Sequence, residues 1–298
     1  MLDYRVETFL AVCQTRNYTR AAEMLSITQP AVSQHIKYLE EYFGVKLFTM
    51  KGKQITLTSE GEEVYQLARI FNLNIKKFKE HLLTDTGKKE ISFGATKTIG
   101  EFIMPSIIAT YAKEYPHRVM KMKVDSTAAL LEKVKYGDMD FAFIEGPFDE
   151  QEFQVLEFME ERYVPVCSPE FDLAGREVTI EELMKYPLIL KEEKRDGGSD
   201  IEQWLLQMNR SIDSFKAIHL VDALPVVKEM VKSNIGISFL YETSVREELL
   251  KGSLVSIAIK NYDVKRKFKF VYRQYSNYDQ EYLDFFDFCD DQRRMLCL

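Results

Sequence analysis

A short polar segment, residues 28–37, carries side chains that could read the edges of DNA bases. It combines hydroxyl, amide and ammonium groups, which donate to and accept from bases and phosphates in a major groove. The candidate DNA-contacting residues in it are Thr28, Gln29, Pro30, Ser33, Gln34 and Lys37. Taken alone, the same residues would also suit a helical hairpin with a polar outer face and no ligand.

Three further polar clusters could bind a small anion. Each precedes an expected helix, where free backbone N–H groups and hydroxyls favour negative charge. The candidate ligand-contacting residues are Thr96, Lys97, Thr98, Ser126, Thr127, Gly197, Gly198 and Ser199. We therefore expect a site for a small, anionic ligand, most simply a carboxylate. Each hydroxyl could equally be a helix cap that touches no ligand.

Signatures of catalysis and metal binding are missing from the sequence. It has no P-loop and no G-x-G-x-x-G, G-x-S-x-G or H-E-x-x-H segment. The four histidines are scattered, and no C-x-x-C pair occurs among Cys13, Cys167, Cys289 and Cys297. We expect no enzymatic activity, no metal and no cofactor, and cysteines that stay reduced and mostly pack. A redox role for Cys167 is left open.

Apolar spacing places the DNA-contacting candidates on the second helix of a helix-turn-helix. Apolar residues recur over 29–43 at spacings of four, three and four, which predicts one buried stripe opposite the polar residues. Thr28 is the expected N-cap and Gly44 the expected end. Helices over 3–15 and 19–25 precede it. The stripe consists of Val32, Ile36, Leu39 and Phe43.

A hairpin follows the helix-turn-helix. Residues 45–48 and 54–58 are prone to form strands around a glycine turn, with Lys51 and Lys53 at the tip. Beside a helix-turn-helix such a hairpin is a wing, and its lysines would meet phosphate or the adjacent minor groove. Alternatively, each lysine only keeps the tip soluble.

A long helix is predicted from Ser59, where Ser59-Glu-Gly-Glu62 has the pattern of a capping box. Its apolar residues recur at spacings of 3, 4, 4, 3 and 4, as in a coiled coil. The simplest partner is the same helix of a second subunit; the alternative is the chain's own larger domain. The apolar residues are Val64, Leu67, Phe71, Ile75, Phe78 and Leu82.

From residue 90 on, strand and helix patterns alternate, which predicts an α/β body with a parallel sheet. The body is expected to have two lobes, lobe I from about 90–161 and 266–298 and lobe II from about 162–265. The expected domains are therefore a winged helix-turn-helix (1–58), a linker and dimerisation helix with a polar hinge (59–89) and a two-lobed α/β domain that carries the candidate ligand-contacting residues (90–298).

Charge divides along the same boundary. The 298 residues have a net charge of −7, but residues 1–90 hold 13 Lys and Arg against 11 Asp and Glu. The first part is thus +2 and the remainder −9, which suits a small DNA-contacting module on an acidic body. No apolar run is long enough for a membrane helix, and the N-terminus does not look like a signal peptide, so we expect a cytoplasmic protein.

Several segments resemble LysR-type transcriptional regulators. The residues that carry the resemblance are 20–40, Gly44-Val-Lys-Leu-Phe48 and Leu57-Thr58-x-x-Gly61, with weaker similarity at 94–100, 137–140 and 234–240. Two departures are Met50 and Lys51, where the family often has arginines, and residues 194–198, which differ from its common Gly-Ser-Gly-Thr pattern.

This resemblance implies a dimer or tetramer that binds double-stranded promoter DNA at a partly palindromic site. Its effector domain would be similar to periplasmic binding proteins and would sense a small molecule, with RNA polymerase as a further partner. By position, Gln29, Pro30, Ser33 and Gln34 would approach bases, and Thr28 and Lys37 the backbone. Effector contacts would map to Thr96, Thr98, Ser126, Thr127 and the 195–199 loop.

Our leading hypothesis is therefore a sequence-specific regulator whose promoter binding responds to an effector. The alternative is a cytosolic solute-binding or transport-accessory protein whose N-terminal module only dimerises it. An α/β enzyme is a third hypothesis, for which the sequence offers no nucleophile or base.

Overall fold

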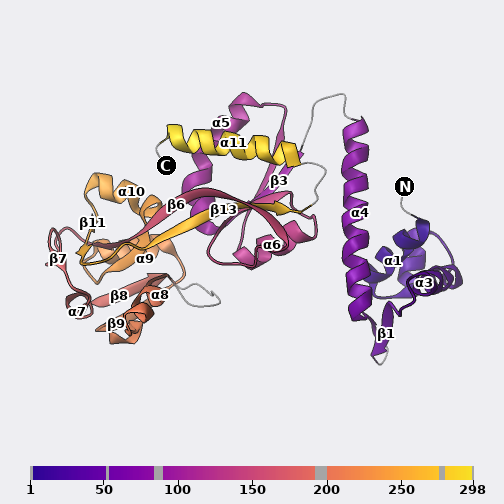
Figure 1. Cartoon of the computed structure of the whole chain (residues 1–298), viewed down its shortest axis with the longest axis horizontal. Coiled ribbons are helices and arrows are strands. Elements are labelled where there is room, and N and C mark those ends of the chain that lie inside the picture. The colour runs from indigo at the N-terminus through magenta and orange to yellow at the C-terminus, as the bar shows by residue number, and fades with distance from the viewer. Residues whose placement is uncertain (1–2, 52–53, 84–89, 192–199, 275–278, 297–298) are drawn as a thin grey trace. The chain divides into compact units, whose positions relative to one another are not determined.

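Two units make up the chain (Figure 1). The computed structural model describes residues 3–51, 54–83, 90–191, 200–274 and 279–296. The first unit comprises residues 1–93, 115–121 and 131–140, and the second comprises 94–114, 122–130 and 141–298. Each is described by itself below.

The N-terminal segment of the first unit is a winged helix-turn-helix followed by a long helix. Three helices pack around one apolar core, and the two wing strands pair antiparallel. The elements are α1 (Tyr4–Thr15), α2 (Tyr18–Leu25), α3 (Gln29–Phe43), β1 (Phe48–Lys51), β2 (Gln54–Leu57) and α4 (Ser59–Leu83). The core residues are Phe9, Ala11, Val12, Ala21, Ala22, Val32, Ile36, Leu39, Leu47 and Ala68.

Local signals set the ends of these helices. The Thr28 hydroxyl accepts from the Ala31 N–H at 3.4 Å as the N-cap of α3, and Gly44 ends the helix with φ +73°. Both predictions are confirmed. The capping box predicted at Ser59 is wrong, because the preceding Thr58 accepts from the Gly61 N–H at 2.8 Å. Gly61 is required there, since a Cβ would collide with the Leu47 carbonyl oxygen.

One residue of the predicted α3 stripe lies outside the core, and part of the predicted α4 stripe lies at the surface of the single chain. Phe43 is 42% exposed and lies against Tyr42 instead of in the α3 core, because the helix ends before its side chain can reach that core. In α4, Val64 packs into the helix-turn-helix core, whereas side chains further along remain at the surface. Those surface residues are Leu67, Phe71 and Phe78, which are 51%, 52% and 56% exposed.

From residue 90 on, strands and helices alternate. The strands are β3 (Glu90–Ala95), β4 (Val119–Val124), β5 (Phe141–Glu145), β6 (Phe153–Cys167), β7 (Glu177–Val178), β8 (Pro187–Lys191), β9 (Ala217–Val221), β10 (Ser238–Tyr241), β11 (Val255–Ser256), β12 (Ala258–Ile259) and β13 (Lys265–Arg273). The helices are η1 (Ile99–Ile103), α5 (Met104–Glu114), α6 (Thr127–Lys135), α7 (Ile180–Leu183), α8 (Asp200–Gln207), η2 (Ile212–Ser214), α9 (Leu224–Lys232), α10 (Glu242–Lys251) and α11 (Asp279–Met295).

The main sheet is mixed rather than wholly parallel as predicted. Its seven strands run β10-β6-β13-β5-β3-β4, with β11 also paired to β6. The last long strand, β13, pairs antiparallel with both β5 and β6, because the chain returns to the middle of the sheet from the far end. A parallel pair does occur between β8 and β9.

Strand lengths also differ from the prediction. The 15-residue β6 includes residues 153–162, whose charged side chains mask the strand pattern. Residues 254–259 do not form one continuous strand, because β11 and β12 pair with different strands, β6 and β7.

Aromatic rings fill the core of the second unit between the sheet and the C-terminal helix. Phe285 of α11 lies 5.2 Å from Phe141 and 4.9 Å from Tyr111 of α5, measured between ring centroids. Phe143 contacts Phe158 of β6 at 4.8 Å. Packed aromatic side chains therefore hold β5 against β6 and against the helices α5 and α11.

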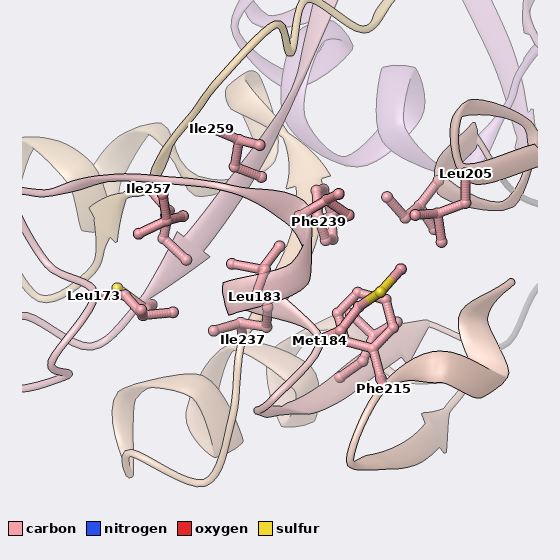
Figure 2. Packing of buried hydrophobic residues seen from close by; sticks show 14 of the residues in the cluster. Leu173, Leu183, Met184, Leu205, Phe215, Ile237, Phe239, Ile257 and Ile259 are labelled. Carbon is pink, nitrogen blue, oxygen red and sulfur yellow. The ribbon is translucent and has the colours of Figure 1, made fainter. Parts of the chain in front are cut away.

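A second core lies in the region of α7, α8 and β10. Figure 2 shows its side chains converging from several elements far apart in the sequence. The labelled members are Leu173, Leu183, Met184, Leu205, Phe215, Ile237, Phe239, Ile257 and Ile259.

Candidate functional sites

The recognition face, defined as Thr28, Gln29, Pro30, Ser33, Gln34 and Lys37, lies on the surface of the helix-turn-helix. Five of these residues are exposed and Ser33 is half-buried. On the other side of α3, Val32, Ile36 and Leu39 are buried in the core. The helix therefore presents one polar surface, as its periodicity predicted.

Hydrogen-bonding groups on this face are only partly occupied. The Gln29 amide donates to the Ser33 hydroxyl at 3.0 Å, and Lys37 pairs loosely with Glu41 at 3.6 Å. Within the described part of the chain, the Gln34 side chain forms no hydrogen bond. Its amide has a donor and an acceptor free for a base edge, the pair that suits adenine.

The wing has the predicted hairpin form. The first strand is shifted along the chain, because residues 48–51, and not 45–48 as predicted, pair with 54–57. Lys51 lies opposite Gln54 at the end of the ladder. Lys53, the other predicted contact at the tip, lies outside the described residues, as does Gly52.

The strand-end site, defined as Thr96, Thr98, Ser126, Thr127 and Glu145, gathers hydroxyls where β3 and β5 end and α6 begins. The Thr96 N–H donates to the Phe143 carbonyl at 3.0 Å, which holds the chain after β3 beside β5. The Asp125 N–H donates to the Ala95 carbonyl at 3.3 Å, which brings the start of α6 to the same edge.

Two of the predicted hydroxyls contact the same backbone unit. The Glu145 N–H donates to the Thr96 Oγ1 at 3.2 Å, and the Thr127 Oγ1 donates to the Glu145 carbonyl at 2.9 Å. Thr96 thus keeps its own proton to donate, while Thr127 keeps lone pairs to accept. The two threonines lie together, as their sequence positions predicted, but both form hydrogen bonds to the chain itself, which was not predicted.

The other predicted ligand contacts are less uniform. The Ser126 hydroxyl accepts from the Ala129 N–H at 3.4 Å and so caps α6. A helix cap was the alternative hypothesis for this residue. Thr98 is buried and makes no capping bond to η1. Lys97 is half-buried between the two threonines, and Gly197, Gly198 and Ser199 lie outside the described residues.

The turn after Thr98 is a π-helix, η1, which the sequence analysis did not foresee. Wide turns of this kind are frequent at functional sites. Gly100 allows η1 to approach β4, since a Cβ there would come within 2.7 Å of the Val124 side chain. This close approach holds the π-helix against the end of β4.

Glu145 is the residue of this site that sequence reasoning missed. It ends β5 and is buried, although a carboxylate is costly to bury. The only signal was the run Phe-Ala-Phe-Ile-Glu-Gly, in which one acidic residue closes an otherwise apolar strand. This acidic residue therefore lies at the same strand edge as the threonine hydroxyls.

Cysteines and acidic residues do not form a reactive centre in the described residues. Cys13, Cys167 and Cys289 are free thiols, and burial raises the pKa of Cys13 and of Cys167 to about 12. In the parts of the chain that the structure covers, no three His, Cys, Asp or Glu side chains are grouped to hold a metal ion. None of the described helices is both long and apolar enough to cross a membrane.

Known proteins share both parts of this chain. The profile for the bacterial regulatory helix-turn-helix protein, lysR family, matches residues 4–62, and that for the LysR substrate binding domain matches residues 85–294. The transcriptional regulator CysL of Bacillus subtilis is 31% identical over 270 residues, which is 90% of this chain and 89% of that protein. The uncharacterized transcriptional regulator YeiE of Escherichia coli K12 is 27% identical over 286 residues, or 96% of each.

Solved structures have the same fold over their full length. ArgP from Mycobacterium tuberculosis has a TM-score of 0.73 at 18% identity and covers 97% of both chains. LysG from Corynebacterium glutamicum, with its effector arginine bound, has a TM-score of 0.71 at 18% identity and covers 98% of this chain and 99% of that one. The resemblance seen in the sequence is thereby confirmed: this chain is a transcriptional regulator of the LysR family, with a DNA-binding helix-turn-helix and an effector-binding domain.

Proposed function

We propose that this regulator binds a partly palindromic promoter site through the recognition faces of two copies, and that a small molecule at the strand-end site alters this binding. The observation that carries the proposal is the division of α3 into a buried apolar side and an exposed side of amide, hydroxyl and ammonium groups. Gln29, Pro30, Ser33 and Gln34 would approach bases. Thr28, Lys37 and the wing lysines Lys51 and Lys53 would contact the phosphate backbone.

Self-association through α4 supplies the second copy. Leu67, Phe71 and Phe78 follow coiled-coil spacing and are about half exposed in the single chain. Burial of such apolar surface contributes about 25 cal/mol per Å² and would favour pairing with the same helix of a partner. The proposed division is 1–58 for DNA binding, 59–89 for dimerisation and hinge, and 90–298 for effector binding.

The strand-end site supports effector binding because it offers directional hydrogen bonds at a strand edge. Thr96 has a hydroxyl proton to donate, and Thr98 lies beside it in the sequence, buried and without a capping bond. Such an edge is the usual place for ligands in open α/β sheets. LysG, a protein of similar fold, was solved with a small effector bound, which supports the same role here.

An anionic effector would have to bind near the buried carboxylate of Glu145. Positive charge from Lys97 would offset part of that repulsion. We therefore propose an effector whose anionic group contacts the hydroxyls and Lys97. We further propose that the protein acts in the cytoplasm, without catalysis, and with RNA polymerase as a partner at the promoter.

Protection of its own upstream intergenic DNA from nuclease tests this proposal. The expected footprint has two halves separated by whole turns of the double helix, which matches a two-fold arrangement of recognition faces. A thermal-shift screen of small carboxylates, repeated with the bound DNA, would identify compounds that change both melting and footprint. Absence of any footprint would favour the alternative, a solute-binding protein that only dimerises through its N-terminal module.

A further inference from the structure

One side of α3 lies against the start of α1 through a partly buried hydrogen bond between Thr8 and His35, which belong to neither the apolar core nor the recognition face. The Thr8 Oγ1 and the His35 Nδ1 are 2.9 Å apart, and Thr8 is only 2% exposed. The ring of Tyr4 meets that of His35 edge-on, with centroids 4.9 Å apart. His35 directly follows Gln34 of the recognition face.

The hydrogen bonds around Thr8 determine the tautomer of His35. The Thr8 hydroxyl donates its one proton to the Tyr4 carbonyl oxygen at 2.9 Å. It must therefore accept in its contact with His35, so the Nδ1 of His35 carries a proton and donates. The imidazole is held by a directional bond, and its ring orientation follows from it.

A second contact lies one helical turn further along the same side of α3. The Arg5 guanidinium stacks over the Tyr38 ring at 3.8 Å and also lies 4.9 Å from the Tyr4 ring centroid. Asp3, the N-cap of α1, fixes this guanidinium through a 3.0 Å ion pair. Since His35 and Tyr38 are three residues apart, both contacts act on one face of the helix.

We infer that Thr8 and His35 are positioning residues for base reading, which set the rotation of α3 about its own axis and so the direction of Gln34. This inference rests on the proposed DNA-binding function. The apolar side of α3 consists of aliphatic contacts, which tolerate small rotations better than a hydrogen bond does. A hydrogen bond at residue 35, next to the reading residue, adds a directional constraint where Gln34 needs it.

The geometry shows why a small rotation matters. A side-chain end about 6 Å from the helix axis moves by about 1 Å when the helix turns by about 10°. A reading group must stay within about 0.5 Å of its productive position, so such a turn would misplace the Gln34 amide. Phosphate contacts by long lysines would be affected far less, because their side chains can follow the phosphate.

Four variants test the inference on duplexes that the wild-type protein selects from a pool with a randomised centre. Thr8→Val removes the acceptor at almost constant shape, whereas Thr8→Ser keeps it. His35→Asn places an amide N–H near the Nδ1 position and keeps the donor, whereas His35→Gln places it near Nε2 and loses the bond. The readout is the ratio of affinities for a selected duplex and for a random duplex of the same length.

We expect Thr8→Val and His35→Gln to lower this ratio by about tenfold, the loss of one well-made base contact. Thr8→Ser and His35→Asn should stay within about threefold of the wild type. Affinity for the random duplex should not change in any variant, which also shows that the domain is folded. The inference is wrong if Thr8→Val keeps the full ratio or if His35→Asn falls as far as His35→Gln.

A wild-type protein that selects no sequence would instead contradict the proposed DNA-binding function. That outcome can be distinguished from a failure of the positioning inference, because it is seen with the wild-type protein before any variant is made.

Discussion

The recognition face and the strand-end site both carry hydroxyl groups near the start of helices, but they direct those groups differently. On α3 the side chains point away from the core, and the Gln34 amide is free for a partner. At the strand ends, Thr96 and Thr127 turn inward and bind the backbone of Glu145. The recognition face can bind a large external surface, whereas the strand-end site uses its hydroxyls to hold its own strands in place.

This difference suggests two ways of building a binding site. A protein that reads DNA needs protruding groups, because a duplex offers the matching edges. A site for a small molecule needs polar side chains that are held in place by internal hydrogen bonds and can still bind the ligand. A few hydrogen bonds must orient the whole ligand. In the proposed effector site, Thr96 would both hold the strand ends and contact the ligand, because its hydroxyl accepts one internal hydrogen bond and keeps a proton to donate.

The largest expected effect concerns the pairing that lets two recognition faces act together. Phe71→Asp places a charge in the exposed stripe of α4, and we expect monomers in light scattering. Affinity for a duplex with two half-sites should fall by about 100-fold or more, because one contact set is lost.

Leu250→Asp is the matched control, since Leu250 is also an exposed apolar side chain on a helix, 82% exposed on α10. It should leave both assembly and DNA affinity unchanged. Equal losses in the two variants would mean that α4 has no special role.

Gln34→Ala tests whether the outward amide reads a base. We expect a cost of about 1–3 kcal/mol on the selected sequence, with relaxed preference at one base pair only. Binding competition against single-base variants of the duplex measures this. A loss of the same size on every sequence would show that Gln34 does not read a base.

Thr127→Val tests the inward arrangement. The hydrogen bond to the Glu145 carbonyl is lost, and we expect the free energy of unfolding to fall by about 1 kcal/mol, measured with urea. Thr98→Val is the matched control, because Thr98 has no capping bond to lose. If Thr98→Val destabilises the fold as much as Thr127→Val, it is wrong to assign a structural role to Thr127 and a ligand-binding role to Thr98.

A pH series gives the smallest expected effect and concerns thiols that neither site uses. Burial raises the pKa of Cys13 and Cys167 from 9.0 to about 12, so the folded chain holds these protons more tightly than the unfolded chain. Their contribution to stability is complete below pH 9 and is lost as the pH rises towards 12. Melting temperatures of the Cys167→Ala variant should therefore decline less steeply over this range than those of the wild type.

Parts of the molecule governed by local periodicity could be predicted from the sequence. The buried side of α3, its Thr28 cap and the Gly44 end follow from residues within one helix. The exposure of Phe43 could not be predicted, because a helical wheel of α3 does not show where the helix-turn-helix core ends. In the same way, the Thr58 cap depends on the chain entering α4 from the wing.

Features that depend on distant residues were harder to predict. The middle of β6 has alternating charges that become a strand only by pairing with β13, more than a hundred residues later. Glu145 was missed because a buried carboxylate is recognised from the elements around it, not from its own segment. The threonines were found by their place before helices, but their internal bonds required the fold.

The most direct test of the account is the salt dependence of DNA binding. The full-length protein should be titrated with its own upstream DNA from about 50 mM to about 200 mM salt. If lysines of α3 and the wing contact phosphates in two copies, affinity should fall by about 100-fold or more over this range, because bound cations are released. An affinity that stays constant with salt would mean that no phosphates are contacted and would contradict the account.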